Sequence, residues 1–146
     1  MSRRRKARRY ALQLLFSLDI GGGEPGPNRF QEFWADKREP EDLREFTEGL
    51  VVGAWIHRDR LDEVLRQTAA NWALERMAAV DRSLLRLAAY ELLFRPDIPT
   101  AVAINEALEI AKEFSTLDSA SFINGLLDQI ARRVPDGTGA EEKPEP

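Results

Sequence analysis

Cysteine is absent from the 146-residue sequence, and histidine occurs once, at His57. Without cysteine the chain has no disulfide, no thiol nucleophile and no cysteine-ligated metal. A single histidine argues against a histidine-based zinc site and against a nucleophile–histidine pair. The carboxylates show no ligand-like spacing, so we predict no catalytic residue, no metal and no cofactor.

Long apolar runs are also missing. No stretch approaches the roughly 18 uninterrupted apolar residues of a membrane span. The basic start followed by ALQLLFSL (11–18) resembles the beginning of a signal peptide, but the run is short and Gln13 interrupts it. We therefore expect a cytoplasmic protein. Its composition, 43% apolar and 32% charged, is that of a globular domain.

Charge is distributed unevenly along the chain. Six of the 21 basic residues fall within the first nine positions, which hold no acid. A basic arm on an acidic body suggests that the arm binds a polyanion. Cations at a helix start oppose the helix dipole, which strengthens the expectation of an anionic partner. Charge alone leaves RNA, DNA and an anionic membrane surface open.

Apolar residues recur at three- and four-residue intervals almost throughout, which predicts an all-α protein. The predicted helices span residues 4–18, 28–36, 41–66 with a break near 57–59, 80–94, 99–114 and 118–134. A glycine- and proline-rich loop lies near 20–27. We predict one domain over 1–134, a compact bundle of about six to seven helices in two packed sub-bundles. The acidic tail, 135–146, is expected to be disordered.

The first helix shows two lines of residues. The predicted core stripe consists of Ala7, Ala11, Leu14, Leu15 and Leu18. Arg5, Arg9, Leu12 and Phe16 form a second line, with Arg8 beside it. Periodicity leaves two interpretations of the second line open. Leu12 and Phe16 pack against another helix, or Phe16 ends a basic row where its ring can stack an unpaired base.

Two later helices contain residues that need an explanation. Glu91 lies on the apolar side of its helix, and a buried carboxylate requires a partner. We predict that it ties two helices together. In the last helix, apolar periodicity runs through Asn124 and Gly125, so we predict that Gly125 permits a close helix approach. Asp118 or Ser119 is the expected N-cap of that helix.

Four stretches resemble the NusB family of transcription antitermination factors. They are RRRKARRYALQLLFSLDI (3–20), VDRSLLRLAAYELLFRPDIP (80–99), VAINEALEIAKEFS (102–115) and DSASFINGLLD (118–128). The resemblance implies two helical halves and no catalysis. It also implies binding of a single-stranded boxA element in nascent ribosomal RNA, together with the ribosomal protein that acts as NusE. The complex would join RNA polymerase with other Nus factors and suppress premature termination.

The resemblance also assigns site residues. It implies RNA contacts for Arg4, Arg5, Lys6, Arg8, Phe16, Asp118 and Phe122. Phe16 stands where the family usually has tyrosine, so it lacks a hydroxyl but keeps the stacking face. Asp81 and, just upstream, Glu75 are implied contacts of the protein partner or of the RNA, and the sequence does not decide between them.

Three competing interpretations remain open at this point. NusB-like domains also precede some ribosomal RNA cytosine methyltransferases, which would make the chain an RNA-binding module of a modification system. The chain could instead be a helical adaptor whose arm binds another anion, such as a membrane. A homodimer could bury Phe16 and Phe122 when no partner is present.

Overall fold

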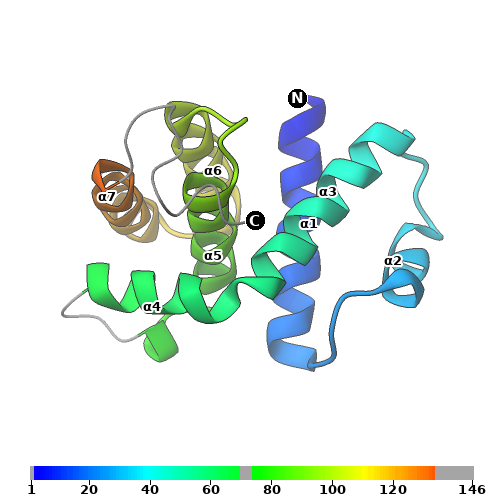
Figure 1. Cartoon of the computed structure of the whole chain (residues 1–146), viewed down its shortest axis with the longest axis horizontal. Coiled ribbons are helices and arrows are strands. Elements are labelled where there is room, and N and C mark those ends of the chain that lie inside the picture. Colours follow the sequence, from blue (N-terminus) through cyan, green and yellow to red (C-terminus); the bar gives the residue numbers. More distant parts are fainter. Residues whose placement is uncertain (1, 70–73, 134–146) are drawn as a thin grey trace.

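The computed structural model describes residues 2–69 and 74–133, and within these ranges every regular element is a helix. The elements are α1 (Arg3–Gly21), α2 (Pro27–Trp34), α3 (Glu41–Ile56), α4 (Arg58–Thr68), the short 3₁₀ helix η1 (Leu74–Arg76), α5 (Ala79–Phe94), α6 (Thr100–Phe114) and α7 (Leu117–Arg132) (Figure 1). The all-α prediction is confirmed.

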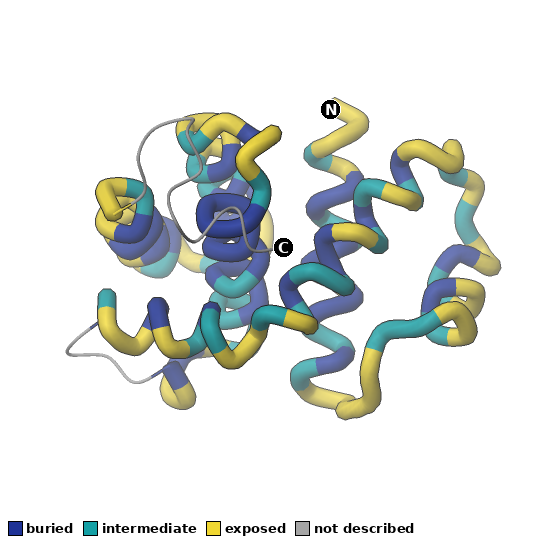
Figure 2. Tube along the Cα trace, in the orientation of Figure 1, coloured by how far each residue is buried: buried dark blue, intermediate teal, exposed yellow. Residues whose placement is uncertain are grey.

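The helices form two groups. α1, α2 and α3 lie on one side of the molecule, and α4 to α7 lie on the other (Figure 1). α5 joins the groups because it packs against α1 and α3 as well as α4, α6 and α7. Eleven of its 16 residues are buried, and Figure 2 shows it dark blue along most of its length. The nearly continuous apolar sequence of α5 therefore becomes the centre of the core.

The predicted helix boundaries hold within a few residues. The long helix predicted over 41–66 breaks at His57, which ends α3 and precedes α4. α1 ends where Gly22 and Gly23 adopt positive φ angles of 79° and 88°, a conformation that glycine adopts without strain. The predicted end at residue 134 and the tail 135–146 lie outside the described residues.

The first helix buries its predicted core stripe. Ala7, Ala11, Leu14, Leu15 and Leu18 are all at most 7% exposed. The second line divides: Leu12 is 2% exposed and belongs to the core, whereas Phe16 is only partly buried. Packing against a neighbouring helix is therefore correct for Leu12, and Phe16 keeps part of its ring at the surface.

Glu91 is tied to another helix, as predicted. Its carboxylate accepts three hydrogen bonds of 2.8–3.1 Å from the Arg8 guanidinium. Both side chains are at most 4% exposed. Burial raises the pKa of Glu91, and the hydrogen bonds from Arg8 oppose this shift. The pair links α1 to α5, and so joins the two groups of helices.

The prediction for Gly125 is wrong. This glycine is exposed, and a Cβ atom added to it would meet nothing within 4 Å. The close approach occurs at Gly53 of α3 instead, where an added Cβ would lie 2.1 Å from the ring of Tyr90 on α5. Apolar periodicity showed that the helix continues through Gly125, but it carried no information about which face meets a neighbour.

Candidate functional site

The basic arm forms the first turns of α1. Ser2 caps the helix, since its hydroxyl accepts a hydrogen bond of 3.1 Å from the backbone N–H of Arg5. No acidic residue lies in the first turn to balance the helix dipole. The carboxylates that balance the arm come from other helices and from the segment before α3. The cations of the arm form two groups.

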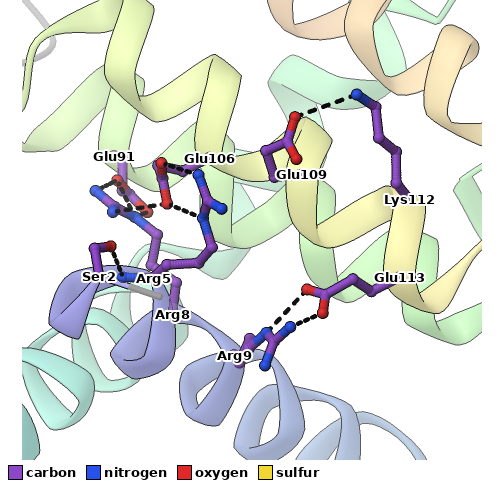
Figure 3. Close-up of polar contacts among 9 residues, drawn as sticks. All are labelled: Ser2, Arg5, Arg8, Arg9, Glu91, Glu106, Glu109, Lys112 and Glu113. Carbon is purple, nitrogen blue, oxygen red and sulfur yellow. Dashed lines mark hydrogen bonds and ion pairs between the residues drawn. The ribbon is translucent and has the colours of Figure 1, made fainter.

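One group faces α5 and α6 (Figure 3). Arg5 donates two hydrogen bonds of 2.8 Å to the carboxylate of Glu106. Arg9 pairs with Glu113, further along α6. Arg8, paired with Glu91, also lies 3.9 Å from Glu106. The hydrogen bond from Arg5 lowers the pKa of Glu106, so this carboxylate stays charged. Acids of α5 and α6 thus neutralise the three arginines of this group.

The other group lies at the surface. The Arg4 guanidinium lies 4.1 Å from the ring centroid of Phe46, a cation–π contact. Arg3 pairs with Asp42, and Lys6 lies 2.9 Å from Glu39. The side chains of Arg3 and Lys6 are 60% and 48% exposed.

Exposed ion pairs contribute only about 0–1 kcal/mol. A phosphate can therefore reach Arg3 and Arg4 at little cost, whereas Lys6 must leave Glu39, whose side chain is only 7% exposed. Arg8 differs from the other cations implied to bind RNA, because its guanidinium is buried and bound by Glu91.

Phe16 lies toward the far end of α1. One turn later, Asp19 accepts a hydrogen bond of 2.6 Å from Arg82 near the start of α5. This contact places the end of α1 beside the start of α5, the helix that carries Asp81 in its first turn. The partly buried Phe16 and the carboxylate of Asp81 therefore belong to the same end of the molecule.

Asp81, Asp118 and Phe122 line one pocket. It has a volume of about 310 Å³ and is completed by Met77, Ala78 and Ser119. Asp81 accepts a hydrogen bond of 2.6 Å from the Ser115 hydroxyl, which joins α5 to the turn between α6 and α7. Phe122 is 36% exposed.

Thr116, rather than Asp118 or Ser119, caps α7, because its hydroxyl accepts from the backbone N–H of Ser119. Asp118 is thus an exposed residue of the first helical turn. The pocket combines two carboxylates, which accept from amino groups or 2′-hydroxyls, with an aromatic face.

Glu75 lies elsewhere. It sits in η1, pairs with Arg66 of α4 and lines a second pocket of about 340 Å³, which Asp19, Leu74, Arg82 and Arg86 complete. Glu75 and Asp81 therefore line different pockets, although the family resemblance implied the same kind of contact for both.

Sequence reasoning missed two exposed apolar residues that are sequence neighbours of residues at the Asp81 pocket. Phe114 and Leu117 are 44% and 79% exposed. Phe114 directly precedes Ser115, which donates to Asp81, and Leu117 directly precedes Asp118 of the pocket. The signal was available, because neither residue falls on the buried stripes of α6 and α7. Exposed apolar area beside polar residues is typical of a contact surface.

Two kinds of site are absent from the described residues. No group of histidine, aspartate or glutamate side chains among them could hold a metal ion. In the same ranges, no helix combines the length and apolarity needed to cross a membrane.

Comparison with known proteins gives a consistent result. The sequence profile of the NusB family matches residues 5–132. A transcription antitermination protein NusB of Symbiobacterium thermophilum is 46% identical, with 95% of each chain covered. Its counterpart in Geobacter sulfurreducens is 49% identical over 93% of this chain and 99% of its own.

Solved structures agree with the sequence comparison. NusB of T. maritima superposes with a TM-score of 0.79 at 34% identity, covering 90% of this chain and 92% of its own. A structure described as antitermination factors NusB and NusE in complex with dsRNA contains a chain with a TM-score of 0.82 at 26% identity. That match covers 91% of this chain and 98% of the other.

Proposed function

The chain belongs to the NusB family, and we propose that it is a non-enzymatic antitermination factor that binds RNA with a NusE-type ribosomal protein. Its RNA is a single-stranded boxA element of nascent ribosomal RNA. The assembly joins RNA polymerase with other Nus factors in the cytoplasm and suppresses premature termination. The observation that supports this best is the pocket shared by Asp81, Asp118 and Phe122, since α5 and α7 bring together residues far apart in sequence.

We assign RNA contacts by accessibility. Arg4 is exposed and takes a phosphate, and Lys6 and Arg5 can join it after leaving Glu39 and Glu106. Phe16 and Phe122 offer ring faces to unpaired bases, which is worth about 1–3 kcal/mol per base. Asp118 accepts from base amino groups or 2′-hydroxyls.

Arg8 has a different role in this proposal. Its guanidinium cannot reach a phosphate without leaving the buried carboxylate of Glu91, so it holds α1 in place instead of touching RNA.

The ribosomal protein is assigned to the acidic side of the molecule. Outside its first nine residues the chain carries a net charge of −10. A basic ribosomal protein complements this charge. Asp81 and Glu75 lie at the start of α5 and in the η1 helix that precedes it, so neighbouring segments of one partner can reach both. Phe114 and Leu117 supply exposed apolar area on the same side as Asp81.

Fluorescence anisotropy tests this assignment. The probes are a boxA-like single strand, a scrambled single strand and a boxA duplex, because a structural relative is described with dsRNA. Each is titrated at two salt concentrations, with and without the NusE-type protein. Preference for the single boxA strand that sharpens with the partner supports the proposal. Equal, salt-sensitive binding to all three probes, unchanged by the partner, would refute it and favour a helical adaptor with a basic arm.

A further inference from the structure

Glu106 of α6 occupies the arginine fork that a phosphate would use. Its two carboxylate oxygens accept from Nε and Nη2 of Arg5, each at 2.8 Å (Figure 3). Bidentate pairing of this kind is the geometry by which guanidinium groups also bind phosphate. An RNA phosphate and Glu106 therefore compete for the same two N–H donors of Arg5.

The competition is stronger at Glu106 than at the exposed pair of Arg3 and Asp42. The side chains of Arg5 and Glu106 are 29% and 13% exposed, whereas those of Arg3 and Asp42 are 60% and 65% exposed. Water screens a shielded pair less than an exposed one. Glu113 holds Arg9 one turn further along α1, with side-chain exposures of 26% for Arg9 and 36% for Glu113.

We propose that Glu106, with Glu113 in a lesser role, is an internal competitor that restrains the affinity of the basic arm for RNA of any sequence. RNA gains Arg5 only by displacing a carboxylate that is already in place. Sequence-independent binding is therefore weak, and the base contacts at Phe16, Phe122 and Asp118 decide which RNA is retained. The inference rests on the proposed function, since it assumes that RNA meets the arm.

The direction in which one substitution changes the RNA affinity distinguishes competition from a structural role. Glu106→Gln removes the charge, and Arg5 becomes free to bind a phosphate. If Glu106 only held the arm in place, the same change would weaken RNA binding.

Glu109→Gln is the matched control. Glu109 lies on the same helix, and its substitution changes the net charge equally. Its ion pair is with Lys112 at 3.2 Å, and it acts on Arg5 only through a Coulombic interaction weaker than that of Glu106, without a hydrogen bond.

The experiment measures binding of the scrambled single strand to the full chain between 50 and 200 mM salt. One added phosphate contact steepens the slope of log K against log salt by about 0.7 for single-stranded RNA. Glu106→Gln should therefore gain about 2.6-fold more affinity than the wild type on going from 200 to 50 mM salt. Glu109→Gln should leave the slope unchanged, and Arg5→Ala combined with Glu106→Gln should abolish the gain.

Circular dichroism confirms that each variant is folded. If Glu106→Gln does not fold, Glu113→Gln, which releases Arg9, takes its place.

Weaker binding by Glu106→Gln, or a gain no larger than that of Glu109→Gln, overturns the inference. If the wild type shows no preference for the boxA strand when the partner is present, the proposed function is overturned instead. The boxA strand thus reports on the function, and the scrambled strand reports on the competition.

Discussion

Replacing Arg8 with methionine should destabilise the protein strongly. The substitution removes the partner of Glu91, whose side chain is 3% exposed. The Glu91 carboxylate then loses the three hydrogen bonds that it accepts from Arg8. Breaking one side of a buried ion pair costs about 3–5 kcal/mol. For a chain of 146 residues, this cost corresponds to a fall in Tm of roughly 10–16 °C.

Replacing both partners should cost far less than replacing one. In Arg8→Met combined with Glu91→Leu, no charge remains in the core, and apolar side chains of similar volume fill the site. Such exchanges are often neutral, or stabilising by about 1–4 kcal/mol. Urea denaturation followed by circular dichroism gives the free energy of unfolding for each variant.

The single variant should also respond to pH in a characteristic way. Burial already raises the pKa of Glu91, and removing Arg8 removes the hydrogen bonds that oppose the shift. A carboxyl whose folded pKa is raised is protonated more readily in the folded chain, so stability falls as pH rises from the unfolded pKa through the folded one. Arg8→Met should therefore lose less stability at pH 5 than at pH 7, relative to the wild type.

Either of two results would refute this reasoning. A loss below about 1 kcal/mol for Arg8→Met would mean that Glu91 is not held in the core as an ion. A double variant no more stable than the single one would mean that the loss came from packing, not from an unpaired charge.

Three further predictions follow from single contacts. Gly53→Ala should lower the free energy of unfolding by about 1–3 kcal/mol, because the added methyl overlaps the Tyr90 ring. Gly125→Ala places its methyl in open space and should stabilise α7 by up to about 1 kcal/mol. Urea denaturation measures both effects. Burial, assisted by Glu39, raises the pKa of Tyr10 to about 12, so the stability that Tyr10 contributes below pH 10 should be lost as pH rises toward 12. An ultraviolet titration of the wild type should show a tyrosine that ionises near pH 12, and Tyr10→Phe should lack it. Phe122→Ala should reduce the ratio of boxA to scrambled RNA affinity in anisotropy titrations, and equal losses on both strands would contradict a stacking role.

Helix positions could be predicted because they depend on local periodicity. The core stripe of α1 and the boundaries of α5 and α6 follow from apolar spacing and from the prolines that precede or follow each helix. The break at His57 was visible as an interruption of the same pattern. Close approach between helices is different, because it depends on two distant segments. The pattern could not show that Gly53, and not Gly125, meets a neighbouring helix.

The candidate site was predictable in its members but not in its arrangement. The family resemblance pointed to Asp81, Asp118 and Phe122, and the structure places them in one pocket. It also pointed to Glu75, which lines a different pocket with Arg66. Glu75 and Asp81 are only six residues apart in sequence, and this spacing does not indicate that they are separated. In the structure Glu75 pairs with Arg66, whereas Asp81 accepts from Ser115.

The basic arm shows why charge in a sequence is a poor measure of charge in space. Six cations without an acid among nine residues suggest a strongly positive surface. In the folded chain, five of these cations have carboxylate partners from α3, α5, α6 or the segment before α3. The acidic body that seemed available for a basic partner is partly used to neutralise the arm. Any partner of the arm must therefore offer more than negative charge. This requirement favours a ligand that also presents bases to Phe16 and Phe122 over one that presents phosphates alone.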